Sequence, residues 1–407
     1  MNYQEPTPQK YLGKTGLVIF LAALSSFPAL STDLYLPALP GMTAYFKVPE
    51  YQTNLTLIIF FVVYAATLLI WGPLSDRYGR RPILLVGLSC YMVAGALCAI
   101  SYDILELNVF RAFQALGAAA AAAVATAIVK DAYRGRKREI TLSVIQVMTV
   151  FSPALGPIIG ALILRFTSWR GVFVAQAILG VIVLAGAIAL TETVRDRLTG
   201  NPLASLKRLG IVLGNRDFAY LLLNFSLMGL VAMAFISSSS YIYEVTFGVS
   251  SQVYSYFFAL FAVAIAAGAP LYVWLSRRFE RSKILSGCFI VSAGTGLLML
   301  LVGRLGPWPF ILTLLPGAVA MSCIRPPSTF LLLDQHEGDA GSVAALVVAS
   351  NMVLGSVGII IVSLNLWSRV ELIGSLNLGL AVLGLAMWLI QGRSRVREQV
   401  HTVRRGT

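Results

Sequence analysis

The chain has 407 residues, of which 57% are hydrophobic and only 12% are charged, whereas soluble globular domains carry about 25% charged residues. Apolar runs of about 20 residues recur along nearly the whole length, and each can cross a hydrocarbon core about 30 Å thick as a helix. The runs lack the alternation of a membrane β-barrel, so the composition excludes a soluble domain and predicts an all-α polytopic membrane protein. The net charge of +13 is typical of the basic cytoplasmic loops of membrane proteins, and no basic stretch has the interleaved aromatic residues of a nucleic-acid interface.

Hydropathy and turn signals divide the chain into twelve predicted transmembrane helices with short connections. Their expected ranges are 15–37, 53–72, 82–101, 107–129, 139–164, 169–190, 218–241, 251–275, 284–303, 308–333, 342–366 and 370–391. The one long connection is charged, contains Gly-Asn-Pro and falls at the middle of the chain, which predicts two pseudo-symmetric six-helix bundles. The expected parts are a cytoplasmic tail (1–14), an N-terminal bundle (15–190), a cytoplasmic central loop (191–217), a C-terminal bundle (218–391) and a basic cytoplasmic tail (392–407).

The lysine and arginine residues of the loops predict the orientation, because basic loops stay in the cytoplasm. With the N-terminus in the cytoplasm, five basic residues fall on the outer side and two fall within helices. These residues are Lys47, Arg165, Arg170, Arg304 and Arg369 outside, and Arg111 and Arg325 within helices. The remaining basic residues lie on the cytoplasmic side, so we expect a multi-pass membrane protein with both termini in the cytoplasm.

The first predicted helix ends in the segment STDLYLPALP, residues 31–40, which contains Asp33. Asp33 is the one acidic residue that lies clearly within a predicted span. A carboxylate in the bilayer is costly unless it is protonated, paired or facing water, so Asp33 is the candidate proton-coupling residue. The alternative is an outer-end residue that is hydrogen-bonded to backbone, because Pro37 follows four positions later.

Residues 72–82, GPLSDRYGRRP, follow the second predicted helix and are expected to form the cytoplasmic loop to the third. Gly72-Pro73 should end one helix, and Pro82 suits the first turn of the next. A degenerate copy, LSRRFER, follows the eighth predicted helix at residues 275–281, which indicates an internal repeat of six helices. A plain basic anchor explains the arginines of residues 72–82 but not the aspartate and the second glycine.

The fourth and fifth predicted helices carry unusual side chains for a membrane span. Arg111 and Gln114 share one face of the fourth helix, a polar stripe that would face a cavity. Arg111 is the first candidate for an electrostatic partner of Asp33, and a residue that snorkels to the outer interface is the alternative. In the fifth helix, prolines and glycines at i, i+3, i+4 and i+7 make a flat, kinked face suited to close packing. These residues are Pro153, Gly156, Pro157 and Gly160.

Candidate substrate contacts are polar or aromatic side chains within the predicted spans. Arg325 precedes Pro326-Pro327 in the tenth helix; it would bind an anionic group or compensate Asp33, or it would snorkel to the cytoplasmic interface. Tyrosines contact ligands through ring and hydroxyl, although membrane-interface belts use the same residue. The cavity candidates are Tyr35, Tyr64, Gln114, Tyr241 and Arg325, with Tyr243 beside them.

These segments resemble the major facilitator superfamily and, within it, the Bcr/CflA-type bacterial drug:proton antiporters, which are twelve-helix efflux transporters. GPLSDRYGRRP is similar to the signature loop of the superfamily, and STDLYLPALP is similar to the D-x-Y-L-P-A-L-P segment of that branch. RAFQALG, residues 111–117, resembles its R-x-x-Q-G element, and SPALGPIIGA, residues 152–161, resembles its antiporter motif. The chain departs from the pattern at Ala115 and Ala161, where the family usually has glycine, and the C-terminal half matches only in topology and in the degenerate repeat.

The resemblance implies a gate latch on the cytoplasmic side. In such a latch Asp76 meets the N-terminal end of a neighbouring helix, such as the eleventh near Ser342, and Arg77 or Arg80 pairs with Asp131. Exposed ion pairs contribute only about 0–1 kcal/mol each, which suits a latch that opens in every cycle. The implied gate residues are Gly72, Pro73, Asp76, Arg77, Gly79, Arg80, Arg81 and Asp131. The resemblance also implies that Asp33 and Arg111 take part in proton coupling.

From this resemblance we expect an exporter of the bacterial inner membrane that moves small amphipathic compounds such as drugs out of the cell in exchange for protons, by alternating access. The alternatives are a proton-coupled importer of a small metabolite and a non-transporting sensor on the same fold. No enzymatic motif is found, since there is no P-loop, and His336 and His401 lie in a loop and in the tail. The four cysteines form no C-x-x-C pair. The expected partners are a small-molecule substrate and membrane lipid, with no cofactor or metal apart from the coupling proton, no nucleic acid, and a monomeric state.

Overall fold

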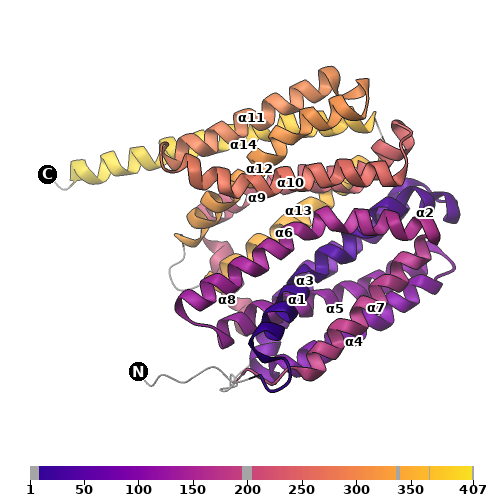
Figure 1. Cartoon of the computed structure of the whole chain (residues 1–407). Helices are drawn as coiled ribbons and strands as arrows, with labels where there is room; N and C mark the ends of the chain where they lie inside the picture. The colour runs from indigo at the N-terminus through magenta and orange to yellow at the C-terminus, as the bar shows by residue number, and fades with distance from the viewer. Residues whose placement is uncertain (1–8, 195–203, 336–339, 366, 406–407) are drawn as a thin grey trace. The chain divides into compact units, whose positions relative to one another are not determined.

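The computed structural model of the chain describes residues 9–194, 204–335, 340–365 and 367–405. These residues form helices joined by short connections, with no strand among them (Figure 1). The α-helices are α1 (Gly13–Asp33), α2 (Leu39–Phe46), α3 (Glu50–Tyr78), α4 (Arg80–Ile100), α5 (Ile104–Ala132), α6 (Gly135–Phe166), α7 (Trp169–Ala189), α8 (Ala204–Gly214), α9 (Arg216–Ser240), α10 (Ser251–Leu275), α11 (Arg281–Val302), α12 (Pro307–Leu333), α13 (Ala340–Ser363) and α14 (Arg369–Arg405). Two 3₁₀ helices, η1 (Leu36–Ala38) and η3 (Gly303–Leu305), and one π-helix, η2 (Tyr241–Thr246), complete them. Parts of the expected N-terminal tail and central loop, together with His336, lie outside the described residues.

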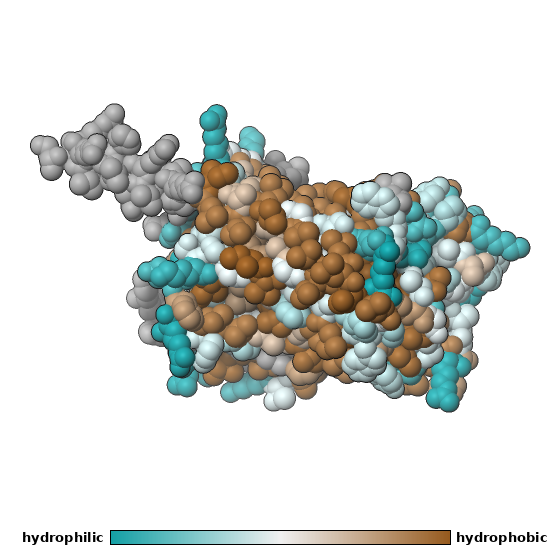
Figure 2. All heavy atoms as spheres, turned by 90° about the horizontal axis from the view of Figure 1, so that it is seen from above, coloured by the Kyte–Doolittle hydropathy of each residue, from teal (hydrophilic) through white to brown (hydrophobic). Residues whose placement is uncertain are grey.

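The helices have the length and surface of membrane spans. Eleven described segments are long and apolar enough to cross a membrane, and α6 adds a shorter apolar segment, Phe151–Phe166. Large apolar side chains such as Ile290, Leu298 and Leu301 are exposed, and Figure 2 shows a face dominated by hydrophobic side chains. Exposed apolar surface of this extent indicates contact with lipid. The chain is therefore a multi-pass membrane protein.

Local sequence explains where several helices begin. Asp103 caps α5, since its carboxylate accepts a hydrogen bond from the backbone N–H of Glu106 at 2.8 Å, and Glu106 Oε2 accepts one from Tyr102 N at 2.9 Å. Ser168 caps α7 through a hydrogen bond from Arg170 N at 3.3 Å. These side chains pair with amide groups that the first turn of a helix leaves without a partner.

The chain divides into two compact units. The first unit contains residues 1–212 and 236–262, and the second contains residues 213–235 and 263–407. The placement of residues 236–262 in the first unit differs from the expected bundle boundaries, and a hydrogen bond of 2.8 Å between the hydroxyls of Thr43 and Tyr241 belongs to this association. Within the first unit α4 packs against α5 and α7, and within the second unit α11 packs against α12 and α14.

The segment 72–82 is almost wholly helical, unlike the loop that the sequence predicts. α3 continues through Gly72 and Pro73 to Tyr78, and α4 begins at Arg80. The prediction that Gly72-Pro73 ends a helix is wrong, because an internal proline removes a single backbone donor and membrane helices tolerate that loss. Gly79 alone makes the turn, with φ +106°, a conformation that favours glycine.

Two further differences concern charged segments. The expected central loop contains α8, a short helix that hydropathy did not single out because it carries Lys207 and Arg208. The last helix, α14, continues beyond the predicted span into the basic tail as far as Arg405. Helical structure at both places follows from local propensity, since neither segment is an apolar run of membrane-spanning length.

Candidate functional site

Asp33 lies at the C-terminal end of α1, in the first unit. The helix stops there, and Tyr35 and the short helix η1 redirect the chain. Asp33 is only 6% exposed. Its Oδ1 accepts a hydrogen bond from Thr32 Oγ1 at 3.4 Å, and its Oδ2 is buried without a hydrogen-bond partner among the described residues. The carboxyl group is therefore buried and weakly bonded within the described part of the chain.

The glycines of α6 pack directly against the end of α1. A Cβ atom at Gly156 would lie 2.7 Å from Asp33 Cβ, and a Cβ atom at Gly160 would overlap the carbonyl oxygen of Leu34. Such short approaches leave no room for a side chain, so both positions require glycine. Pro153 and Pro157 lie within the same helix. The structure thus brings together two motifs that are more than a hundred residues apart in the sequence.

Arg111 is fully buried in α5. Its Nη1 donates hydrogen bonds to Gln114 Oε1 at 2.6 Å and to the carbonyl oxygen of Ser31 at 3.2 Å. Its guanidinium carbon lies 4.3 Å from the ring centroid of Phe60 and 4.6 Å from that of Tyr35. The structure therefore surrounds Arg111 with neutral acceptors and aromatic faces, which stabilise a buried guanidinium. An electrostatic partnership of Arg111 with Asp33 remains a prediction.

A chain of neutral polar groups extends from Arg111 across the first unit. Gln114 Nε2 donates to Gln176 Oε1 at 2.9 Å, and Gln176 Nε2 donates to the carbonyl oxygen of Ser31 at 3.2 Å. The Ser31 hydroxyl lies 2.7 Å from the hydroxyl of Tyr91. Gln176 was not predicted from the sequence, where its signal is a lone amide among the apolar residues of α7. This network ties α1, α4, α5 and α7 together.

The tyrosines expected near a substrate are buried. The hydroxyl of Tyr35 lies 3.1 Å from Thr56 Oγ1, and Tyr64 is 7% exposed. Tyr241 is bonded to Thr43 through its hydroxyl. Arg325 belongs to the second unit, where its side chain is exposed on α12.

Tyr243 and Glu244 lie in the π-helix η2 of the first unit. The ring of Tyr243 stacks on Phe257 with centroids 4.8 Å apart. Glu244 is half-buried, and its Oε2 accepts a hydrogen bond from Ser251 Oγ at 2.6 Å. The buried side chain of Tyr254 lies within electrostatic range of both Glu244 and Asp33. Glu244 was expected only near an outer helix end, and its hydrogen bond from Ser251 was not predicted from the sequence.

The charged residues between α3 and α4 form a cluster around Arg80. Arg80 is 5% exposed, its Nε donates to Asp131 Oδ2 at 2.9 Å, and its Nη1 lies 2.5 Å from Asp76 Oδ1. The same Nη1 donates to Ser75 Oγ at 2.6 Å. The structure therefore brings Arg80 and Asp131 together, and it gives Asp76 an arginine partner within the first unit. Arg77 lies over the Tyr78 ring, with 5.5 Å between its guanidinium carbon and the ring centroid.

Glu192 completes this cluster and was missed by the sequence analysis. Its carboxylate accepts hydrogen bonds from the backbone N–H groups of Arg80 at 3.0 Å and Arg81 at 3.1 Å. A carboxylate at this position satisfies the first amides of α4 and interacts favourably with the helix dipole. A Cβ atom at Gly79 would lie 2.5 Å from Glu192 Oε2, so the glycine turn also makes room for the cap.

Comparisons of sequence and of structure both match this chain to membrane transporters. The Major Facilitator Superfamily profile matches residues 18–361. The uncharacterized MFS-type transporter YdgK of Bacillus subtilis (strain 168) is 28% identical over 383 residues, which cover 91% of this chain and 94% of that protein. A chloramphenicol resistance protein of Pseudomonas aeruginosa is 35% identical over 173 residues, 42% of this chain and 41% of that protein. The multidrug resistance protein MdtL of Escherichia coli O9:H4 (strain HS) is 30% identical over 191 residues, 47% of this chain and 48% of that protein.

The two resistance proteins are thus matched over less than half of their length. Among solved structures, a bacterial homolog to the human lysosomal transporter Spinster, in an inward-facing and occupied conformation, aligns with a TM-score of 0.74 at 13% identity and covers 93% of this chain and 97% of that chain. A D-xylose-proton symporter aligns with a TM-score of 0.68 at 16% identity and covers 90% and 96%. At these identities the likeness shows the fold of a membrane transporter.

Proposed function

Because the chain belongs to the Major Facilitator Superfamily, we propose that it exports small amphipathic compounds such as drugs across the bacterial inner membrane in exchange for protons. Twelve membrane-spanning helices in two bundles, with both termini in the cytoplasm, are part of the proposal. The motif resemblance to Bcr/CflA-type antiporters supports it, as do the two resistance proteins among the relatives.

The observation that carries the proposal is the environment of Asp33. Its Oδ2 has no hydrogen-bond partner among the described residues, and its Oδ1 has only the 3.4 Å contact with Thr32. An ionised carboxylate in these surroundings loses hydration without compensating hydrogen bonds. A protonated carboxyl group avoids most of this cost, so Asp33 is suited to bind a proton and to release it when its surroundings change.

Because the end of α1 packs against α6, proton binding at Asp33 would also change the position of α6. Gly156 contacts Asp33 and Gly160 contacts Leu34, so a shift at the end of α1 displaces α6. Two prolines in α6 each remove a backbone hydrogen bond, which makes bending of that helix less costly. The site that takes up the proton is therefore in direct contact with a helix suited to bend.

The coupling of substrate export to proton uptake then follows from thermodynamic linkage between the two binding steps. If a substrate lowers the affinity of Asp33 for a proton, the proton lowers the affinity for the substrate by the same factor. One proton that moves down a membrane potential of 100 mV releases about 2.3 kcal/mol, to which a pH gradient adds. On the cytoplasmic side, the pairs of Arg80 with Asp76 and Asp131 would provide the latch, because both carboxylates are partly exposed and regain water when they separate from Arg80.

The test uses inside-out vesicles energised to an acidic interior. Candidate amphipathic compounds are added, and collapse of the pH gradient is followed for the wild type and for Asp33→Asn. Asp217→Asn is the matched control, because Asp217 is an exposed acid at the start of α9.

We expect collapse with the wild type and with Asp217→Asn, and no collapse with Asp33→Asn. A response of Asp33→Asn equal to that of the wild type would show that Asp33 is structural. A substrate-dependent proton movement in the opposite direction would identify an importer instead.

A further inference from the structure

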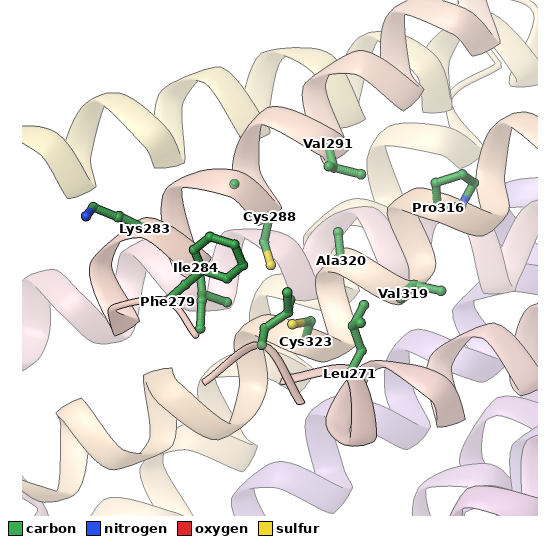
Figure 3. A pocket seen from close by; sticks show the side chains of 12 residues that line it. Leu271, Phe279, Lys283, Ile284, Cys288, Val291, Pro316, Val319, Ala320 and Cys323 are labelled. Atoms are coloured by element: carbon green, nitrogen blue, oxygen red, sulfur yellow. The ribbon is translucent and has the colours of Figure 1, made fainter. Parts of the chain in front are cut away.

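The second unit contains a pocket that plays no part in the proposed transport cycle. It has a volume of about 660 Å³ and lies between the end of α10, the first turns of α11 and the middle of α12 (Figure 3). This volume is within the range of about 300–1,000 Å³ that holds drug-sized ligands. α10 and α12 touch closely at Gly268, where a Cβ atom would lie 2.6 Å from Ser322 Cβ. Along α10, the pocket lies beyond this contact in the C-terminal direction, beside Leu271 and Leu275.

The wall of the pocket is almost wholly apolar. Its lining comes from aliphatic and aromatic side chains, two thiols and a single charged side chain, Lys283; representative residues are Leu275, Phe279, Ile284, Cys288 and Val319. Figure 3 shows Phe279 and Cys288 facing the interior, with Lys283 at one end. Gly287 also lines the pocket, and a Cβ atom there would meet no other atom within 4 Å. The wall thus has an open groove on α11 and offers no acceptor for a polar ligand.

The end of the pocket at Lys283 is basic. The connection from α10 and the first turn of α11 carry four cations and one acid, which are Arg277, Arg278, Arg281, Lys283 and Glu280. Arg278 lies over the Trp274 ring at 5.2 Å, and Arg281 lies over the Phe330 ring at 4.0 Å. Lys283 Nζ and Glu280 Oε2 are 3.5 Å apart, but both side chains are at least 70% exposed. The predicted topology places this connection on the cytoplasmic side.

We propose that this pocket binds an anionic phospholipid, with an acyl chain against the apolar wall and the phosphate beside Lys283 and Arg278. Charge complementarity decides the occupant: a lipid phosphate matches the net positive end, whereas a cationic amphiphile would be repelled by it. Basic side chains at the cytoplasmic ends of transmembrane helices bind anionic headgroups, and each contributes about fivefold in affinity. The site lies in the second unit, and none of its lining residues takes part in the proposed proton coupling.

Two pairs of variants test the proposal on the full-length protein. Gly287→Leu fills the open groove of the pocket, and Gly294→Leu is its matched control, because Gly294 lies in the same helix, also meets open space at Cβ, and does not line the pocket. Lys283→Gln with Arg278→Gln removes two charges from the basic end. Arg136→Gln with Lys137→Gln is the control, since both residues are exposed at the start of α6.

The measurement is native mass spectrometry of protein released from nanodiscs of phosphatidylglycerol or of phosphatidylcholine with the same acyl chains. We expect the wild type and both controls to retain phosphatidylglycerol in preference to phosphatidylcholine. Loss of two basic residues should lower that preference by about 25-fold, and Gly287→Leu should lower retention of both lipids.

Equal retention of both lipids by the wild type would overturn the proposal, as would an unchanged preference in the Lys283→Gln, Arg278→Gln protein. Displacement of the lipid by soluble glycerol phosphate would show that the basic end binds a free phosphate without the pocket, and would also overturn it. If Gly287→Leu does not fold, the Lys283→Gln, Arg278→Gln protein alone tests whether the pocket binds an anionic phospholipid, because these substitutions change only exposed side chains. An effect on lipid retention with normal proton movement would separate this site from the proposed transport function.

Discussion

Gly160 gives a direct test of the packing between α1 and α6. A Cβ atom at this position would overlap the carbonyl oxygen of Leu34 and lie 2.9 Å from its carbonyl carbon. Both atoms belong to backbone, so the helices must separate, since no side chain can rotate away. Overpacking costs about 1–3 kcal/mol, and alanine recovers about 0.5–1 kcal/mol relative to glycine in a helix. Because the contact is with backbone, we expect Gly160→Ala to lower the free energy of unfolding by about 1–2 kcal/mol.

The assay is thermal unfolding of the purified protein in detergent, followed by proton movement in the vesicles described above. Gly41→Ala in α2 is the matched control, because a Cβ atom there meets no other atom within 4 Å. It should leave stability unchanged or raise it slightly. If Gly160→Ala were as stable and as active as Gly41→Ala, the close contact between α1 and α6 would be refuted.

Three further changes probe the rest of the first unit. Arg80→Gln removes charged hydrogen bonds to two carboxylates, which contribute about 1.5–3 kcal/mol, and should lower the thermal unfolding midpoint; an unchanged midpoint would contradict the cluster. Gln176→Leu leaves the amide of Gln114 without its acceptor at a cost of about 1–3 kcal/mol, which the same unfolding assay detects, and wild-type stability would show that the network is dispensable. Glu192→Gln weakens the cap of α4, so hydrogen exchange should accelerate at its first amides but not at its centre; uniform exchange would count against the cap.

The sequence was a good guide to the membrane-spanning helices and a poor guide to their ends. Hydropathy locates a span because the hydrocarbon core requires about 20 apolar residues. Beyond the core, each end depends on individual hydrogen bonds, some of them to residues distant in the sequence, which hydropathy does not register. α3 continues past Gly72-Pro73, and α4 starts at Arg80 because Glu192 caps it from 112 positions away in the sequence.

The candidate site was likewise predicted only in part from the sequence. Asp33 and Arg111 are identifiable from the sequence because charges within membrane spans are rare and costly. Their partners depend on how the helices rotate about their axes, which the sequence alone does not determine. The contact of Gly156 with Asp33 and the hydrogen bond of Gln176 to Ser31 join residues on different helices, and only the packed structure reveals them.

In the proposed transport cycle, Arg111 would assist proton exchange at Asp33 without bonding to its carboxylate. Its guanidinium is bonded to the carbonyl oxygen of Ser31 and lies over the ring of Tyr35, two positions before and two positions after Asp33. A positive charge therefore lies near the end of α1 without a direct bond to the carboxylate. A direct buried ion pair would resist protonation, because breaking one costs about 3–5 kcal/mol. A cation in this position would lower the cost of ionising Asp33 without occupying its Oδ2, which has no hydrogen-bond partner among the described residues.

This arrangement predicts the behaviour of variants at Arg111. Arg111→Gln removes the cation, so Asp33 should keep its proton through the cycle, and substrate-driven proton movement should fall to the level of Asp33→Asn. The double variant should be no worse than either single variant, because both changes remove the same step. Arg111→Lys keeps the charge but loses the planar contact with the aromatic rings, so it should retain part of the activity. Wild-type proton movement in Arg111→Gln would mean that Asp33 titrates without help from this cation.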